Sequence, residues 1–191
     1  LSGANGCGKS TLLACLAGIE DYFSGEILYK SSPVGSKVSW ATVRKSIGYV
    51  KADCSMLYGD LTLRESLRLV DSLRGENQGG ISSDSLQGIV QRLGLDRYMD
   101  TAIGNLSFGT KKKASILVSC SGSRKELLLL DEPFEGLDED SCLTLEAILQ
   151  NELSHIAKVI VSHRYLNIKT SRKLILQSGI LVEEKGRDNV C

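Results

Sequence analysis

The sequence lacks any hydrophobic run long enough to cross a membrane. Its longest purely aliphatic stretch runs only from Leu127 to Leu130, whereas a membrane-spanning helix needs roughly 20 apolar residues. The chain also lacks an excess of charge, because 23 Lys and Arg residues balance 23 Asp and Glu residues. Without a positive field, non-specific attraction to nucleic acid is not expected. The chain itself is therefore predicted neither to span a membrane nor to bind nucleic acid.

Cysteine pairing motifs are absent as well. The six cysteines are scattered, with no CxxC pair and no histidine at metal-ligand spacing. This pattern is typical of reduced thiols in the cytosol and argues against a disulfide framework or a zinc site. The composition does provide 42% hydrophobic residues in a chain of 191, which is enough for the core of one globular domain.

The N-terminal segment contains a phosphate-loop motif. The residues that fit G-x-x-x-x-G-K-[ST] are Gly3, Ala4, Asn5, Gly6, Cys7, Gly8, Lys9, Ser10 and Thr11. The glycines permit backbone angles that turn successive N–H groups toward one anion. Lys9 would place a cation on the β- and γ-phosphates of a nucleotide, and the Ser10 hydroxyl would ligate Mg²⁺. A helix over residues 10–17, ended by Gly18, would direct its N-terminus at the phosphates.

A second motif is the aliphatic run at residues 127–130, which is followed by Asp131 and Glu132. A continuous aliphatic run predicts a strand that is buried on both faces. In open α/β sheets, ligands and metals bind at the carboxyl ends of such strands. Adjacent strand residues point to opposite sides, so the two acids can have different roles. We expect Asp131 to hold Mg²⁺ through a water molecule and Glu132 to polarise the attacking water.

A third segment, residues 105–113, distinguishes among the many nucleotide-binding families that share these two motifs. With it, the chain resembles the ATP-binding cassette (ABC) family, whose signature reads L-S-G-G-Q before a helix and the acidic strand. The matching signature residues here are Leu106, Ser107, Gly109 and Thr110. Other segments match in family order: residues 47–50 the strand entering the Q-loop, residues 135–138 the D-loop with Asp138, residues 159–164 the switch strand with His163, and residues 174–184 the closing hairpin.

The resemblance implies a fold as well as a family. It implies an α/β P-loop NTPase, in which a mostly parallel sheet is flanked by helices and a small helical subdomain, approximately residues 53–118, carries the signature. It also implies that residues 1–191 form one ABC ATPase domain without its first strands, because only two residues precede the phosphate loop. Within the helical subdomain, we predict a helix capped by Thr62, a loop at residues 75–80, and a second helix opened by Ser82 or Ser83.

The resemblance also implies a function, which is hydrolysis of MgATP coupled to transport. In the family, two ATPase domains sandwich ATP, so the signature of this chain would contact the nucleotide bound by a second domain, identical or different. Glu132 and His163 would be the catalytic residues, with His163 contacting the γ-phosphate. A transmembrane transporter subunit or domain would hold the chain at the cytoplasmic face of a membrane. Residues near 51–73, with Met56, Leu57 and Tyr58, are predicted to dock this partner.

Two positions depart from the family pattern. Phe108 replaces the middle glycine of the signature, which is expected to alter packing across the dimer. Ala52 stands where the family has the Q-loop glutamine, and the adjacent Asp53 is a candidate substitute. The short basic run at residues 111–113 is interpreted as solvated surface.

Two functions outside transport are alternatives. A DNA-repair ATPase head shares the motifs but carries long coiled-coil arms between phosphate loop and signature, and this chain has neither room nor sustained heptads for them. A ribosome-associated translation factor usually carries two cassettes. A GTPase is not expected, because no N-K-x-D guanine motif is present. We favour the transporter ATPase.

Overall fold

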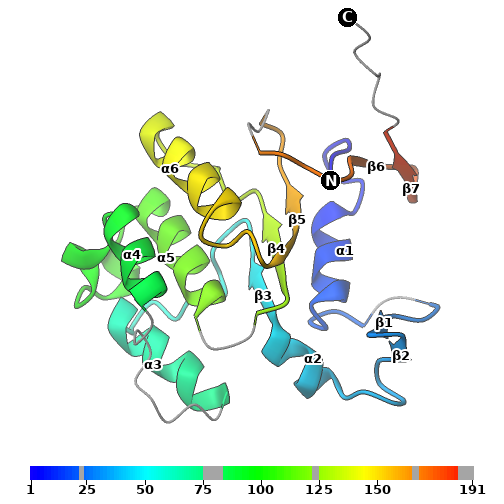
Figure 1. Cartoon of the computed structure of the whole chain (residues 1–191), viewed down its shortest axis with the longest axis horizontal. Coiled ribbons are helices and arrows are strands. Elements are labelled where there is room, and N and C mark those ends of the chain that lie inside the picture. The colour runs from blue at the N-terminus through cyan, green and yellow to red at the C-terminus, as the bar shows by residue number, and fades with distance from the viewer. Residues whose placement is uncertain (22–23, 75–83, 122–124, 165–167, 185–191) are drawn as a thin grey trace, which may run out of the picture.

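The computed structural model describes residues 1–21, 24–74, 84–121, 125–164 and 168–184 (Figure 1). The helices are α1 (Lys9–Leu16), α2 (Trp40–Ser46), α3 (Leu63–Arg74), α4 (Asp84–Arg92), α5 (Phe108–Cys120) and α6 (Glu139–Gln150). The strands are β1 (Leu28–Tyr29), β2 (Ser32–Pro33), β3 (Ile47–Val50), β4 (Leu127–Asp131), β5 (Ala157–Val161), β6 (Leu174–Gln177) and β7 (Ile180–Glu183). Short 3₁₀ helices cover Asp96–Tyr98 and Ile103–Asn105.

The central sheet is parallel, with the strand order β3-β4-β5. The register pairs Leu130 of β4 with Val50 on one side and with Ile160 on the other. Because all three strands run in the same direction, their carboxyl ends meet at one edge of the sheet. The residues that follow β3, β4 and β5 are therefore neighbours, although they are distant in sequence.

Strand β4 is buried on both faces, as its aliphatic run predicts. Leu128 and Leu130 belong to one hydrophobic cluster, which they share with residues of α5 and α6. Leu129 belongs to a second cluster, with Leu13 of α1 and Val43 of α2. Figure 1 shows α5 and α6 on one side of the sheet and α1 and α2 on the other. This layered α/β architecture confirms the fold class expected from the sequence.

The region between β3 and β4 is helical, and it contains no strand among its described residues. Its first helix begins with a reciprocal cap: the Thr62 hydroxyl accepts from the Glu65 N–H at 3.2 Å, and the Glu65 carboxylate accepts from the Thr62 N–H at 2.8 Å. The predicted cap at Thr62 is thus confirmed. The predicted loop at residues 75–80 and the helix start at Ser82 or Ser83 lie outside the described residues.

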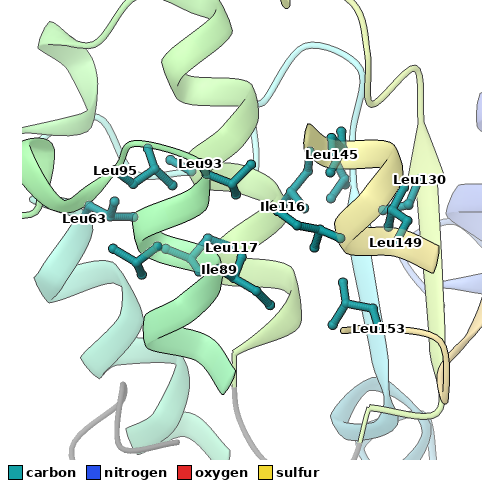
Figure 2. Packing of buried hydrophobic residues seen from close by; sticks show 14 of the residues in the cluster. Leu63, Ile89, Leu93, Leu95, Ile116, Leu117, Leu130, Leu145, Leu149 and Leu153 are labelled. Carbon is teal, nitrogen blue, oxygen red and sulfur yellow. The ribbon is translucent and has the colours of Figure 1, made fainter. Parts of the chain in front are cut away.

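This helical region shares its core with the sheet. Leu63, Leu93 and Leu117, from three different helices or their ends, pack together in the same cluster as Leu130 of β4 (Figure 2). Helices α3 and α4 pack on α5, and α5 in turn contacts β3. The bounds 53–118 for a separate subdomain stay a prediction.

Two antiparallel pairs complete the described structure. Strands β6 and β7 form the predicted hairpin that turns at residues 178–179. Strand β1 pairs antiparallel with β2. None of the helices in the described residues has the length and apolar character that spanning a membrane requires.

The residues just before the phosphate loop extend the sheet. The Ser2 N–H donates to the Leu174 carbonyl at 2.9 Å, and the Leu176 N–H donates to the Ser2 carbonyl at 2.8 Å. On the other side, the Leu1 nitrogen donates to the Ile160 carbonyl of β5 at 2.7 Å. The two residues before the phosphate loop are thus hydrogen-bonded to β5 on one side and to β6 on the other.

Candidate active site

The N-terminus of α1 keeps its backbone donors free of side-chain caps. Helix α1 follows Gly8, which has a φ of 101° and no side-chain cap, and its first turn contains no acidic residue. In contrast, the side chain of Ser107 caps α5 and that of Asp138 caps α6. Because the first N–H groups of a helix have no partner within the helix, the start of α1 is suited to bind an anion.

Lys9 lies along the phosphate loop and is only 8% exposed. Its ammonium donates to the carbonyls of Gly3 at 2.9 Å and Ala4 at 3.0 Å. An ammonium has three N–H donors, so these bonds leave one donor for a phosphate oxygen. Gly3 anchors the loop on β6: it has a φ of 149°, and a Cβ there would lie 2.4 Å from the Leu176 carbonyl oxygen. Only glycine fits this position.

Asp131 is a buried carboxylate at the carboxyl end of β4. It is 1% exposed, and neither of its oxygens has a hydrogen-bond partner among the described residues. Tyr49 of β3 is close enough to sense its charge: burial first, and then the negative charge of Asp131, raise the pKa of Tyr49 to about 12. A buried carboxylate without donors is costly unless a cation satisfies it.

Glu132 and His163 meet at the ends of β4 and β5. The backbone N–H of His163 donates to Glu132 Oε2 at 3.3 Å, and the ring nitrogen Nε2 of His163 lies 3.5 Å from Glu132 Oε1. The Glu132 N–H donates to the Val161 carbonyl at 3.0 Å, which holds the residue at a φ of 46°. The two residues predicted as catalytic are thus in contact, at the same edge of the sheet as Asp131.

The signature residues open α5. The Ser107 hydroxyl accepts from the Thr110 N–H at 3.3 Å, so Ser107 is the helix cap. A Cβ on Gly109 would lie 2.5 Å from the Gly136 carbonyl oxygen. Gly109 is therefore required by packing against the turn after β4, within one chain. Leu106 is buried, and the contact of these residues with the nucleotide of a second domain stays a prediction.

The segment 135–138 leads into α6, as the D-loop assignment requires. The Ser141 N–H donates to the Asp138 carboxylate at 2.7 Å and holds the pKa of that carboxyl below its usual value. The ring of Phe108 covers Gly136: a Cβ on that glycine would lie 2.4 Å from Phe108 Cδ1. Phe108 is 44% exposed, so it packs on its own chain and still offers surface.

The interpretation of the basic run 111–113 as solvated surface is wrong for Lys112. This side chain is fully buried, its ammonium donates to the Ala52 carbonyl, and it lies 5.2 Å from the centroid of the Phe108 ring. The sequence carried a signal that we missed. Lys112 precedes the buried residues Ser115, Ile116 and Ser119 at helical spacing, and therefore lies on the inner face of α5.

In the segment after β3, the carboxylate of Asp53 is bound by neighbouring residues. The Asp53 carboxylate accepts from the Ser55 N–H at 2.9 Å, which lowers its pKa, and it lies 3.5 Å from the Lys51 ammonium. Asp53 is thus engaged locally. Met56 is 49% exposed and Tyr58 67% exposed, whereas Leu57 packs against the core.

Comparisons with known proteins agree with this geometry. A family model described as ABC transporter matches residues 1–135. An uncharacterised ABC transporter ATP-binding protein of Escherichia coli is 31% identical over 190 residues, which cover 96% of this chain and 82% of that protein. ABC transporter A family member 1 of Dictyostelium discoideum is 28% identical over 181 residues, which cover 94% of this chain but only 20% of that protein.

Solved structures share the fold. The ATP-binding subunit of an ABC transporter superposes with a TM-score of 0.74 at 24% identity, covering 95% of this chain and 76% of that chain. A dimeric ATP-binding cassette in a post-hydrolysis state with ADP and Pi superposes with a TM-score of 0.75 at 21% identity, covering 97% of this chain and 84% of that chain.

Proposed function

The chain belongs to the ABC transporter family, and we propose that it binds MgATP, pairs with a second ATPase domain and hydrolyses ATP to drive a membrane-embedded partner. One arrangement carries this proposal. The uncapped N-terminus of α1, with Lys9 beside it, follows a segment bonded to β5, and the carboxylates of Asp131 and Glu132 lie at the end of the adjoining β4. Loss of phosphate release on the substitution Glu132→Gln tests it.

The donor set around Asp131 fits Mg²⁺. Magnesium prefers oxygen ligands and usually keeps several waters, and both Asp131 oxygens are buried without a partner among the described residues. Asp131 would hold the ion through water, and the Ser10 hydroxyl would bind it directly. When bound, the ion neutralises negative charge on the phosphate oxygens of ATP.

Other residues of the chain would bind the phosphates, activate the attacking water and orient it. The N–H groups at the start of α1 and the Lys9 ammonium hold the phosphates in place. Glu132 polarises the attacking water and accepts its proton, and its strained backbone keeps the carboxylate directed at the site. His163 contacts both Glu132 and the γ-phosphate, and so orients the water between them.

A second ATPase domain completes the site. Ser107, the Gly109 backbone and the start of α5 from that domain would present donors to the γ-phosphate on the side opposite the phosphate loop. Gly109 packs on the Gly136 carbonyl within the chain, so the signature and the D-loop segment 135–138 would approach the partner together. The second domain is an identical or a related copy.

Transport requires a transmembrane partner, which would hold this chain at the cytoplasmic face of a membrane. Its docking surface is proposed around Met56 and Tyr58, because both are exposed apolar side chains on a segment between β3 and α3. Exposed apolar residues that are adaptable in shape suit a protein contact.

Cysteines at these two positions are expected to cross-link a membrane polypeptide. Met56→Cys and Tyr58→Cys should capture an integral membrane protein in membranes from cells that make the protein, as seen by mass spectrometry of the cross-linked band. Ile180→Cys, which is exposed on β7, is the matched control and should capture none. Equal capture from all three positions, or from none of them, would contradict docking at residues 56–58.

Ala52→Gln is expected to raise partner-stimulated ATP turnover by about fivefold, since one added hydrogen bond contributes about 1 kcal/mol. Alanine has no side-chain donor or acceptor, whereas glutamine can bridge Mg²⁺, water and the partner interface. The backbone carbonyl that accepts from Lys112 is kept. Steady-state phosphate release measures the effect, and ATP affinity should stay within a factor of about two.

Asp53→Ala is the control for this substitution. The Asp53 carboxylate accepts a hydrogen bond from Ser55 and pairs with Lys51. Because both partners are local, loss of the carboxylate should change ATP turnover little. If Asp53→Ala abolishes turnover while Ala52→Gln has no effect, Asp53 has the role of the glutamine and the assignment of Ala52 is wrong.

A further inference from the structure

Lys112 is a buried cation on a helix that the proposed mechanism uses only at its first turn. It is fully buried, and none of the ion pairs among the described residues includes it. Its ammonium donates to the Ala52 carbonyl and faces the Phe108 ring. Burying an ammonium is costly, and a carbonyl and an aromatic face compensate only in part. A methionine would fill the same space without that cost.

The neighbouring lysines on α5 are more exposed than Lys112. Lys111 donates to the Gly104 carbonyl from a partly exposed position, and Lys113 lies 3.5 Å from the Ser141 hydroxyl. Neither side chain is fully buried. The inward direction of Lys112 is therefore specific to its place on the helix.

The contacts of Lys112 join three segments at the candidate active site. The Ala52 carbonyl belongs to the segment after β3, and Phe108 belongs to the signature. Phe108 in turn packs on Gly136, in the turn after β4. A displacement of any of these segments would stretch a contact that involves the ammonium or the ring beside it.

We propose that Lys112 is a positioning residue that holds the segment at Ala52 against the signature end of α5, so that both move as one unit when ATP is hydrolysed. The proposal rests on the proposed ATPase function. It gives a physical role to residue 52 through its backbone, because the carbonyl, unlike an amide side chain, is available with any amino acid at that position.

Lys112→Met is expected to loosen this connection and slow turnover. Methionine keeps the length and apolar body of the side chain but has no donor, so the Ala52 carbonyl loses its bond. Hydrogen exchange of the Cys54 and Leu57 amides, which donate to carbonyls within this segment, should become about tenfold faster. In the full protein, kcat should fall about tenfold with KM nearly unchanged, because the phosphate loop is intact.

Two further variants make the result specific. Lys113→Met removes a neighbouring lysine and should match the wild type in both measurements. Lys112→Gln restores an amide donor and should recover part of the slow exchange and part of kcat. A purely structural residue would instead change the melting temperature and leave the KM-against-kcat pattern unaffected.

Three outcomes would overturn the proposal: wild-type exchange and kcat in Lys112→Met, equal changes in Lys113→Met, or unfolding of both Lys112 variants by circular dichroism. If the wild-type protein itself releases no phosphate, the proposed function fails. The exchange measurement still decides whether Lys112 holds the segment, since it needs no ATP.

Discussion

Replacement of Glu132 by glutamine should reduce ATP hydrolysis about 10²- to 10⁴-fold, which is the range that a general base contributes. Glutamine has the same shape, and its side-chain oxygen can still accept from the His163 N–H. It has no negative charge, so it neither polarises a water molecule strongly nor accepts its proton. Binding of ATP should change little, because Lys9 and the start of α1, which we propose hold the phosphates, are unchanged.

The expected consequence is a protein that closes on ATP and stays closed. Phosphate release measures the loss of turnover, and light scattering should detect an ATP-dependent dimer that the wild type forms only transiently. Glu26→Gln is the matched control, because Glu26 is an exposed carboxylate between α1 and β1. Wild-type turnover in Glu132→Gln, together with no ATP-dependent dimer, would remove Glu132 from the mechanism.

Replacement of Lys9 by alanine should weaken ATP binding at least about tenfold, because a charge-assisted contact of about 1.5–3 kcal/mol is lost. The substitution also removes the donor from the carbonyls of Gly3 and Ala4, so the loop loses part of its internal order. Both effects act in the same direction. Isothermal titration calorimetry with ATP and Mg²⁺ measures the change in Kd.

Lys37→Ala provides the comparison, since Lys37 is exposed and lies outside the loop. It should bind ATP with wild-type affinity. Melting temperatures of both variants separate loss of the fold from loss of the site. Equal affinity of wild type and Lys9→Ala would mean that the loop does not hold the phosphates.

Local patterns predicted much of the framework. The aliphatic run of β4 and the cap at Thr62 each depend on a few adjacent residues, so the sequence alone indicates them, whereas the hairpin of β6 and β7 was expected from the resemblance to the family. The placement of His163 beside Glu132 depends on strand order instead. No local pattern specifies that β5 lies next to β4, and only the resemblance to the family led us to expect it.

Other features depend on tertiary packing that a linear pattern does not specify. The helical spacing of Lys112 indicates the inner face of α5, but its bond to the Ala52 carbonyl depends on where the segment after β3 lies. The packing of the Phe108 ring on Gly136 is likewise absent from the linear pattern, and the effect of Phe108 across a dimer stays a prediction. The sequence does not show that the Asp53 carboxylate accepts a hydrogen bond from the Ser55 N–H in a local turn.

The hydrogen bonds that join the start of the phosphate loop to β5 and β6 have a consequence for how the chain folds. Ser2 is fixed by Leu174 and Leu176, which lie at the opposite end of the chain. Because translation runs from the N- to the C-terminus, the phosphate loop is synthesised well before β6, and its hydrogen bonds through Ser2 form only once β6 is present. ATP binding then reports completed folding, and a ribosome-stalled chain that stops before β6 should fail to bind ATP.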